Sequence, residues 1–73
     1  MSEKLNLLLK VFSETLKCEV DLNTNKAEII QWDSLKNLEL ILNLQDVFEY
    51  KFSTQELAEA HSVREFGKIL GII

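Results

Sequence analysis

The chain has 73 residues, with twelve acidic against eight basic side chains, no proline, two glycines and one cysteine. This length fits a single domain over residues 1–73, and a domain so small buries only about 60% of its unfolded surface, which argues against a large enclosed active site. The net charge of −4 argues against a nucleic-acid partner, because such partners require a basic surface. One cysteine cannot form an internal disulfide, and no segment resembles a secretory signal or a membrane span, so we expect a cytoplasmic protein.

The first predicted helix runs from Ser2, as N-cap, to about Leu16. At about 100° of rotation per residue its apolar side chains gather on one face, and the members of this face are Leu5, Leu8, Leu9, Phe12 and Leu16. Leu7 and Val11 fall off that face. We therefore expect a helix with one buried side.

Residues 17–32 show no helical periodicity and contain four turn formers, Asp21, Asn23, Thr24 and Asn25. A loop of this length in a compact domain is usually functional or ordered by packing. The apolar side chains expected to supply that packing are Val20, Leu22, Ile29, Ile30 and Trp32.

The second predicted helix begins at Asp33-Ser34, where both residues are good N-caps, and runs to about Glu49 or Tyr50. It has two apolar faces. The face expected in the core consists of Leu40, Ile41, Leu44, Val47 and Phe48. The opposite face carries a leucine stripe of Leu35, Leu38 and Leu42, edged by the carboxylates of Glu39, Asp46 and Glu49.

One helix of so small a bundle buries one face, so we expect the leucine stripe to be exposed. An apolar strip edged with carboxylates favours docking of a basic partner. In the alternative interpretation, a loop or the third helix covers the leucines and the acids only keep the domain in solution.

The third and fourth predicted helices each open with a capping-box pattern, at Ser53–Glu56 and at Ser62–Glu65. The third ends near Ala60, and the fourth ends at Gly71, a typical C-terminal stop. No segment sustains period-two alternation. The predicted fold class is therefore all-α: a small four-helix bundle with three longer helices, a short third helix and a long loop between the first two.

The negative charge is concentrated in the middle of the chain. Residues 33–59 hold six acids and two bases, a net −4, whereas residues 1–32 contribute −1 and residues 60–73 contribute +1. We therefore expect partners with basic patches to bind at the second helix, which carries Ser34, and at the short helix after it.

Ser34 has two interpretations. In the first, Ser34 or Asp33 is only an N-cap, as is common at helix starts. In the second, Ser34 carries a covalent group through a phosphate ester, which the free N–H groups and the positive dipole end of a helix N-terminus favour.

These residues also carry a resemblance to a family. Trp32-Asp33-Ser34-Leu35, the Leu-Glu-Leu at 38–40, Asp46 and Phe48 resemble the second helix of acyl carrier proteins, and the order of elements is similar over nearly the whole chain. The resemblance implies an acyl-carrier bundle in which Ser34, next to Asp33, receives 4′-phosphopantetheine from coenzyme A. Acyl groups would then be held as thioesters on the terminal thiol of that group.

The resemblance also implies the partners. A phosphopantetheinyl transferase would modify Ser34, and enzymes with basic docking patches would load and transfer the acyl group. The positions that match the family's partner-binding residues are Leu35, Leu38, Glu39, Leu42 and Asp46. On this interpretation the protein is a monomeric carrier and not an enzyme.

Four positions depart from the family pattern. Gln31 stands where members often have glycine, and Trp32 replaces a usually small residue. Lys36 stands where fatty-acid carriers usually place an acid, and Gln45 replaces a carboxylate. These differences favour a carrier of a specialised biosynthetic pathway over a housekeeping fatty-acid carrier.

Other functions stay open at this point. The chain could be an unmodified acidic adaptor that binds through the leucine stripe, or a carrier of peptidyl or aminoacyl groups. A hydrolase built on Ser34, His61 and an acid is disfavoured, because no glycine elbow or oxyanion hole accompanies the serine.

His61 is expected in the turn before the fourth helix. Cys18 is expected to be a small apolar residue, and one cysteine with one histidine predicts no metal site.

Overall fold

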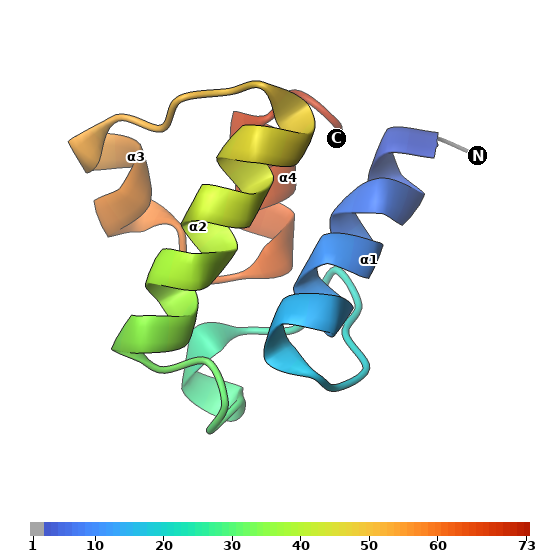
Figure 1. Cartoon of the computed structure of the whole chain (residues 1–73), viewed down its shortest axis with the longest axis vertical. Coiled ribbons are helices and arrows are strands. Elements are labelled where there is room, and N and C mark those ends of the chain that lie inside the picture. Colours follow the sequence, from blue (N-terminus) through green and yellow to red (C-terminus); the bar gives the residue numbers. More distant parts are fainter. Residues whose placement is uncertain (1–2) are drawn as a thin grey trace.

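The computed structural model describes residues 3–73 as helices joined by loops (Figure 1). In chain order the elements are α1 (Glu3–Leu16), the 3₁₀ helix η1 (Lys26–Glu28), α2 (Ser34–Phe48), α3 (Thr54–Glu59) and α4 (Val63–Ile69). Within residues 3–73 no strand forms, and no helix is long and apolar enough to cross a membrane. The predicted all-α fold with a short third helix is confirmed, whereas η1 was not predicted. The predicted N-cap Ser2 lies outside the described residues.

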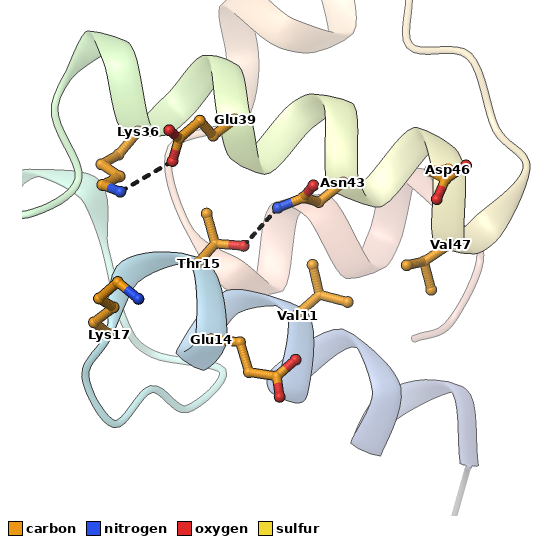
Figure 2. A pocket seen from close by; sticks show the side chains of 9 residues that line it. All are labelled: Val11, Glu14, Thr15, Lys17, Lys36, Glu39, Asn43, Asp46 and Val47. Atoms are coloured by element: carbon orange, nitrogen blue, oxygen red, sulfur yellow. Dashed lines mark hydrogen bonds and ion pairs between the residues drawn. The ribbon is translucent and has the colours of Figure 1, made fainter.

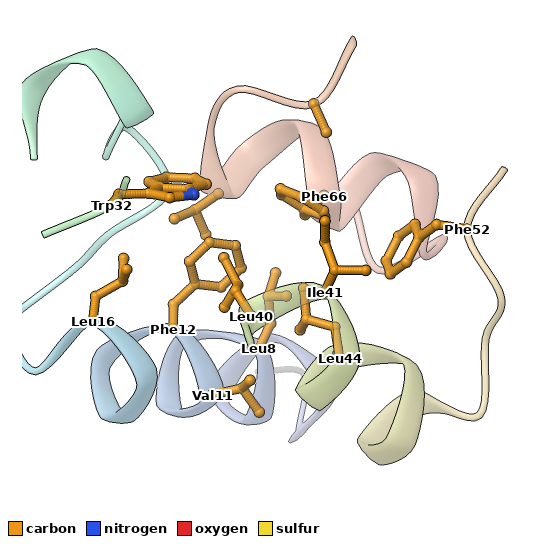
Figure 3. Close-up of a cluster of buried hydrophobic side chains, with 12 residues drawn as sticks. Leu8, Val11, Phe12, Leu16, Trp32, Leu40, Ile41, Leu44, Phe52 and Phe66 are labelled. Atoms are coloured by element: carbon orange, nitrogen blue, oxygen red, sulfur yellow. The ribbon is translucent and has the colours of Figure 1, made fainter. Parts of the chain in front are cut away.

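The hydrophobic core lies where α1 packs against both α2 and α4 (Figure 3). The side chains with no or almost no exposed surface are Leu8, Phe12, Leu16, Leu40, Leu44, Val63 and Phe66. Two aromatic side chains from loops complete this core. The Trp32 ring lies edge-on to Phe12 at a centroid distance of 5.4 Å, and Phe52 lies edge-on to Phe66 at 5.5 Å. Edge-to-face pairs add about 0.5–1.5 kcal/mol each beyond area burial, so these rings hold the loops to the helices.

Two valines contradict the predicted helix faces. Val11 was placed off the buried face of α1 but is buried, because α1 packs against two helices and its buried arc is wider than one stripe. Val47 was placed in the core but is 40% exposed, because it lines the open groove between α1 and α2. A helical wheel gives the direction of a side chain, and only the neighbouring helices decide whether that direction is covered.

Helices α1 and α2 end in the same way, with a residue in the left-handed conformation. Lys17 follows α1 with φ of 57°, and Glu49 follows α2 with φ of 51°. After α1, the Cys18 N–H donates to the carbonyl of Ser13 at 3.3 Å, which is the wrapped ending that satisfies a free carbonyl. Non-glycine residues in this conformation cost about 1–2 kcal/mol, so both ends carry local strain.

The capping box predicted for α3 is present. The Ser53 hydroxyl accepts from the Glu56 N–H at 3.1 Å, and the Glu56 carboxylate accepts from the Ser53 N–H at 2.9 Å. The Tyr50 hydroxyl also donates to Glu56, at 2.7 Å, and this ties α3 to the end of α2. The Ser53 backbone N–H foremost, and then the Tyr50 hydroxyl, lower the pKa of Glu56, and the hydrogen bond to Glu56 raises the pKa of Tyr50.

The box predicted for α4 forms only in part. The Ser62 hydroxyl accepts from the Glu65 N–H at 3.2 Å as expected. The Glu65 carboxylate, however, accepts from the N–H of His61 at 2.7 Å. The side chain therefore reaches one residue further back than the pattern predicts. His61 lies exposed in the turn between α3 and α4, as expected.

Candidate functional site

The long loop between α1 and α2 is fixed to the turn before α4. The Lys26 N–H donates to the carbonyl of His61 at 2.7 Å, and the Val63 N–H donates to the carbonyl of Thr24 at 3.1 Å. Asn25 caps η1 with its side chain between these two bonds. Two backbone hydrogen bonds across so many residues give the loop a defined path toward α2.

Trp32 fixes the end of this loop. Its side chain is only 2% exposed, in the core against Phe12, and its indole N–H donates to Asn37 Oδ1 at 2.8 Å. Asn37 belongs to the first turn of α2. The two residues that precede Ser34 are therefore held by the core and by the helix, so the serine has a defined position.

Ile30 departs from the prediction for the loop. Val20, Leu22 and Ile29 are partly buried against the core, and Trp32 is buried, as expected. Ile30, by contrast, is 94% exposed. Its predicted packing role is wrong: the loop packs Ile29 and Trp32 against the core and leaves Ile30, which lies between them in sequence, in solvent.

Asp33, and not Ser34, caps α2. The Asp33 carboxylate accepts from the N–H of Lys36 at 2.9 Å, and its carbonyl accepts from the N–H of Asn37 at 2.8 Å. Ser34 is the first helical residue, and its side chain is exposed. The two N-cap candidates of the sequence thus separate into a structural aspartate and a serine whose hydroxyl is not needed for capping.

The start of α2 also offers free hydrogen-bond donors. Among the described residues, neither the Ser34 N–H nor the Leu35 N–H has a hydrogen-bond partner. Such donors at a helix N-terminus, together with the positive end of the helix dipole, favour an anion. A phosphate ester on Ser34 would be compatible with this environment.

The leucine stripe is exposed along α2. Leu35 is 67% exposed, and Leu38 and Leu42 are each 55% exposed. The opposite face, with Leu40, Ile41 and Leu44, is buried. The prediction of two apolar faces, one buried and one in solvent, is confirmed, and neither a loop nor α3 covers the stripe.

The charges beside the stripe are not all free. The Lys36 ammonium group pairs with the Glu39 carboxylate at 3.0 Å, an exposed pair on one side of the helix. Asp46 and Glu49 are exposed, and neither forms an ion pair within the described chain. Lys36 therefore offsets Glu39, the first of the three acids beside the stripe, and the unpaired negative charge of that edge lies toward the C-terminal end of α2.

A groove runs between α1 and α2 beside the stripe (Figure 2). Glu39 and Asp46 line it from α2, and Glu14 lines it from α1. A hydrogen bond from the Asn43 amide to the Thr15 hydroxyl, at 3.0 Å, crosses it. Two of the predicted partner-binding acids thus stand on the ridge between the groove and the leucines.

The predicted site residues lie on one helix and the residue before it. Asp33 and Ser34 mark the start of α2, and the predicted partner positions Leu35, Leu38, Glu39, Leu42 and Asp46 follow along its exposed side. Two features of this region were not predicted from the sequence: the exposure of Ile30 and the pairing of Lys36 with Glu39. The spacing of three between lysine and glutamate could have indicated the second.

The fold matches a known carrier protein. A solution structure of holo acyl carrier protein from Geobacter metallireducens superposes with a TM-score of 0.83, over 96% of this chain and 84% of that one, at 23% sequence identity. No protein-family model and no curated protein sequence matches the chain. The chain therefore has the acyl carrier protein fold.

Proposed function

We propose that this protein is an acyl carrier protein in which Ser34 bears 4′-phosphopantetheine and α2 receives the partner enzymes. The observation that carries the proposal is the exposed hydroxyl of Ser34 at the start of α2, freed from capping by Asp33, in a chain with the acyl carrier protein fold. The Geobacter metallireducens structure with this fold is a holo carrier, which supports the same modification here.

The modification is a phosphoryl-group transfer from coenzyme A. The Ser34 oxygen forms a bond to the phosphorus that bears pantetheine, and the pyrophosphate bond breaks. Adenosine 3′,5′-bisphosphate leaves with the bonding electron pair, and the serine proton passes to a base of the transferase. When bound, the group supplies a flexible arm with a terminal thiol that can hold an acyl group as a thioester.

The residues around Ser34 fit this role. The Ser34 and Leu35 N–H groups, which have no partner among residues 3–73, would lie close to the phosphate. Trp32 and Asp33 fix the backbone on which the ester forms. The exposed hydroxyl leaves room for a transferase to approach.

The leucine stripe and the acids beside it would receive the transferase and the loading enzymes. An exposed apolar strip gains about 25 cal/mol for each Å² that a partner buries, and the carboxylates steer partners with basic patches. Because Lys36 is paired with Glu39, steering would depend on Asp46 and Glu49. We propose that this charge pattern selects partners of a specialised pathway.

The test is a mass measurement. The purified protein is incubated with coenzyme A and a promiscuous phosphopantetheinyl transferase, in parallel with a known carrier and with the Ser34→Ala variant. We expect the wild type to gain one phosphopantetheine unit, mapped to the peptide that contains Ser34, and the variant to gain none. An unlabelled wild type beside a labelled known carrier would refute the proposal.

The same variant separates carrier from adaptor. An unmodified adaptor that binds through Leu35, Leu38 and Leu42 would keep its partners in Ser34→Ala, whereas a carrier loses its function. The cargo is decided next, by offering the modified protein to acyl-loading and to aminoacyl-loading enzymes and recording which group appears by mass.

A further inference from the structure

Ile30 is the most exposed of the large apolar side chains in the described chain, at 94%. Single exposed apolar residues are common and need no function by themselves. Ile30 differs from such residues in its setting, because it lies in the loop that leads directly into Ser34.

The loop that presents Ile30 is held on both sides. Before it, η1 is capped by Asn25 and joined to the α3–α4 turn through Lys26. After it, Trp32 is buried in the core, and Ile29 is partly buried. An apolar side chain on an ordered loop loses little additional backbone freedom on binding, so more of its burial energy remains available for affinity.

The distance to Ser34 is limited by the chain itself. Ile30 and Ser34 are four residues apart, so their Cα atoms are at most about 14 Å apart. A standard protein interface covers about 800 Å² on each partner, which corresponds to a disc of radius about 16 Å. An interface of this size centred on the Ser34 hydroxyl therefore extends far enough to reach Ile30.

Ile30 and the leucine stripe lie in different directions from Ser34. Figure 1 shows the loop before α2 at one end of the molecule, and α2 running away from it toward the end where the C-terminus lies. Leu42 lies eight residues along the helix, about 12 Å from Ser34. Along the chain, Ser34 thus lies between the exposed Ile30 of the loop and the exposed leucines of α2.

We propose that Ile30 anchors the transferase that modifies Ser34, by entering an apolar pocket with a basic rim on that enzyme. This inference rests on the proposed modification of Ser34. The rim is basic because residues 28–42 carry three acids, Glu28, Asp33 and Glu39, against the single base Lys36. The same charges oppose a second copy of this chain as the occupant, since acids would then face acids.

The experiment compares kcat/KM for phosphopantetheine transfer to the wild type and to three variants. Ile30→Ser removes the anchor, and we expect a loss of about tenfold, the fold-change that 1.4 kcal/mol of lost burial produces. Ile30→Leu keeps an apolar side chain and keeps most of the rate. Ile73→Ser is the control for the same side-chain change away from Ser34: Ile73 is 49% exposed, lies beside Gly67 and belongs to the C-terminus at the other end of the molecule. Thermal unfolding of each variant is measured as well, to check that all of them fold.

The outcomes separate the inference from the proposed function. An Ile30→Ser rate within about twofold of wild type, or equal losses in Ile30→Ser and Ile73→Ser, overturns the anchor while leaving Ser34 as the modified residue. A loss in Ile30→Leu as large as in Ile30→Ser also overturns it. A dimer that depends on Ile30 in sedimentation would make a second copy the occupant and overturn the assignment. If the wild type itself is not modified, the proposed function fails first.

Discussion

Asp33 caps α2 and Ser34 does not, so substitutions at these adjacent positions should differ in their effects on stability and on modification. Asp33 accepts the hydrogen bond from the Lys36 N–H at 2.9 Å, so Asp33→Ala removes the cap of a 15-residue helix. Loss of such a cap costs about 1 kcal/mol, within a range of about 0.5–2 kcal/mol. In a domain of this size, 1 kcal/mol lowers Tm by about 4–8 °C.

Ser34→Ala, by contrast, changes an exposed side chain whose hydroxyl does not cap the helix. We expect the free energy of unfolding to change by less than about 0.5 kcal/mol. The Asp33→Asn variant is the control, because asparagine keeps an acceptor oxygen at the N-cap and caps about as well as aspartate. Only Ser34→Ala is expected to abolish the gain of phosphopantetheine.

The assay is urea and thermal unfolding followed by far-ultraviolet circular dichroism, together with the mass measurement on each variant. A loss of about 1 kcal/mol in Ser34→Ala without a loss in Asp33→Ala would refute the assignment of Asp33 as the cap, since the hydroxyl would then be the cap. An equal loss of stability in Asp33→Asn and Asp33→Ala would also refute this assignment, because the acceptor oxygen would then not account for the loss.

Lys17→Gly, at φ of 57°, should raise the free energy of unfolding by about 0.5–1 kcal/mol, because glycine adopts this conformation without a Cβ clash. The double variant Glu39→Lys with Asp46→Lys should keep its helical signal, since both side chains are exposed, but lose about tenfold in kcat/KM for modification at low salt. The pKa of Glu56 is lower in the folded protein than in the unfolded chain, so its carboxylate stabilises the fold at any pH above the usual glutamate pKa. This stabilisation is lost as pH falls through the usual pKa and then through the lowered pKa of the folded protein. Tyr50→Phe, which removes one hydrogen bond to Glu56, should make the acid-side decline in Tm shallower.

Each of these has a matched control. Lys10→Gly lies in the interior of α1 and should lose about 1 kcal/mol, so a similar loss in Lys17→Gly would contradict the strain at the helix end. Glu3→Lys with Glu19→Lys makes the same charge change outside α2 and should leave the modification rate near wild type. A large loss of helicity in the α2 double variant would show that this face is buried. If Tm falls as steeply with acid in Tyr50→Phe as in the wild type, the Tyr50 hydroxyl does not contribute to the lowered pKa of Glu56.

Local signals predicted much of the candidate site. The two apolar faces of α2 follow from 3.6-residue periodicity, and the exposed face contains Leu35, Leu38 and Leu42 as the wheel indicated. The start of α3 at Ser53 follows from short-range hydrogen bonds between its own residues. The sequence also limited the N-cap of α2 to two neighbours, Asp33 and Ser34, but it offered no basis for choosing between them.

The sequence by itself determined the four α-helices, the capping box of α3 and the solvent-facing stripe of α2, because these depend on contacts within a few residues and on a regular rotation per residue. The tertiary structure decided what the loop residues do. Trp32 enters the core and Ile30 points into solvent, although both are large apolar side chains two residues apart. That difference depends on Phe12, which lies against the indole, and on the hydrogen bond to Asn37. Contacts between segments distant in sequence have no periodic signature, so only the packed chain shows which side chain they receive.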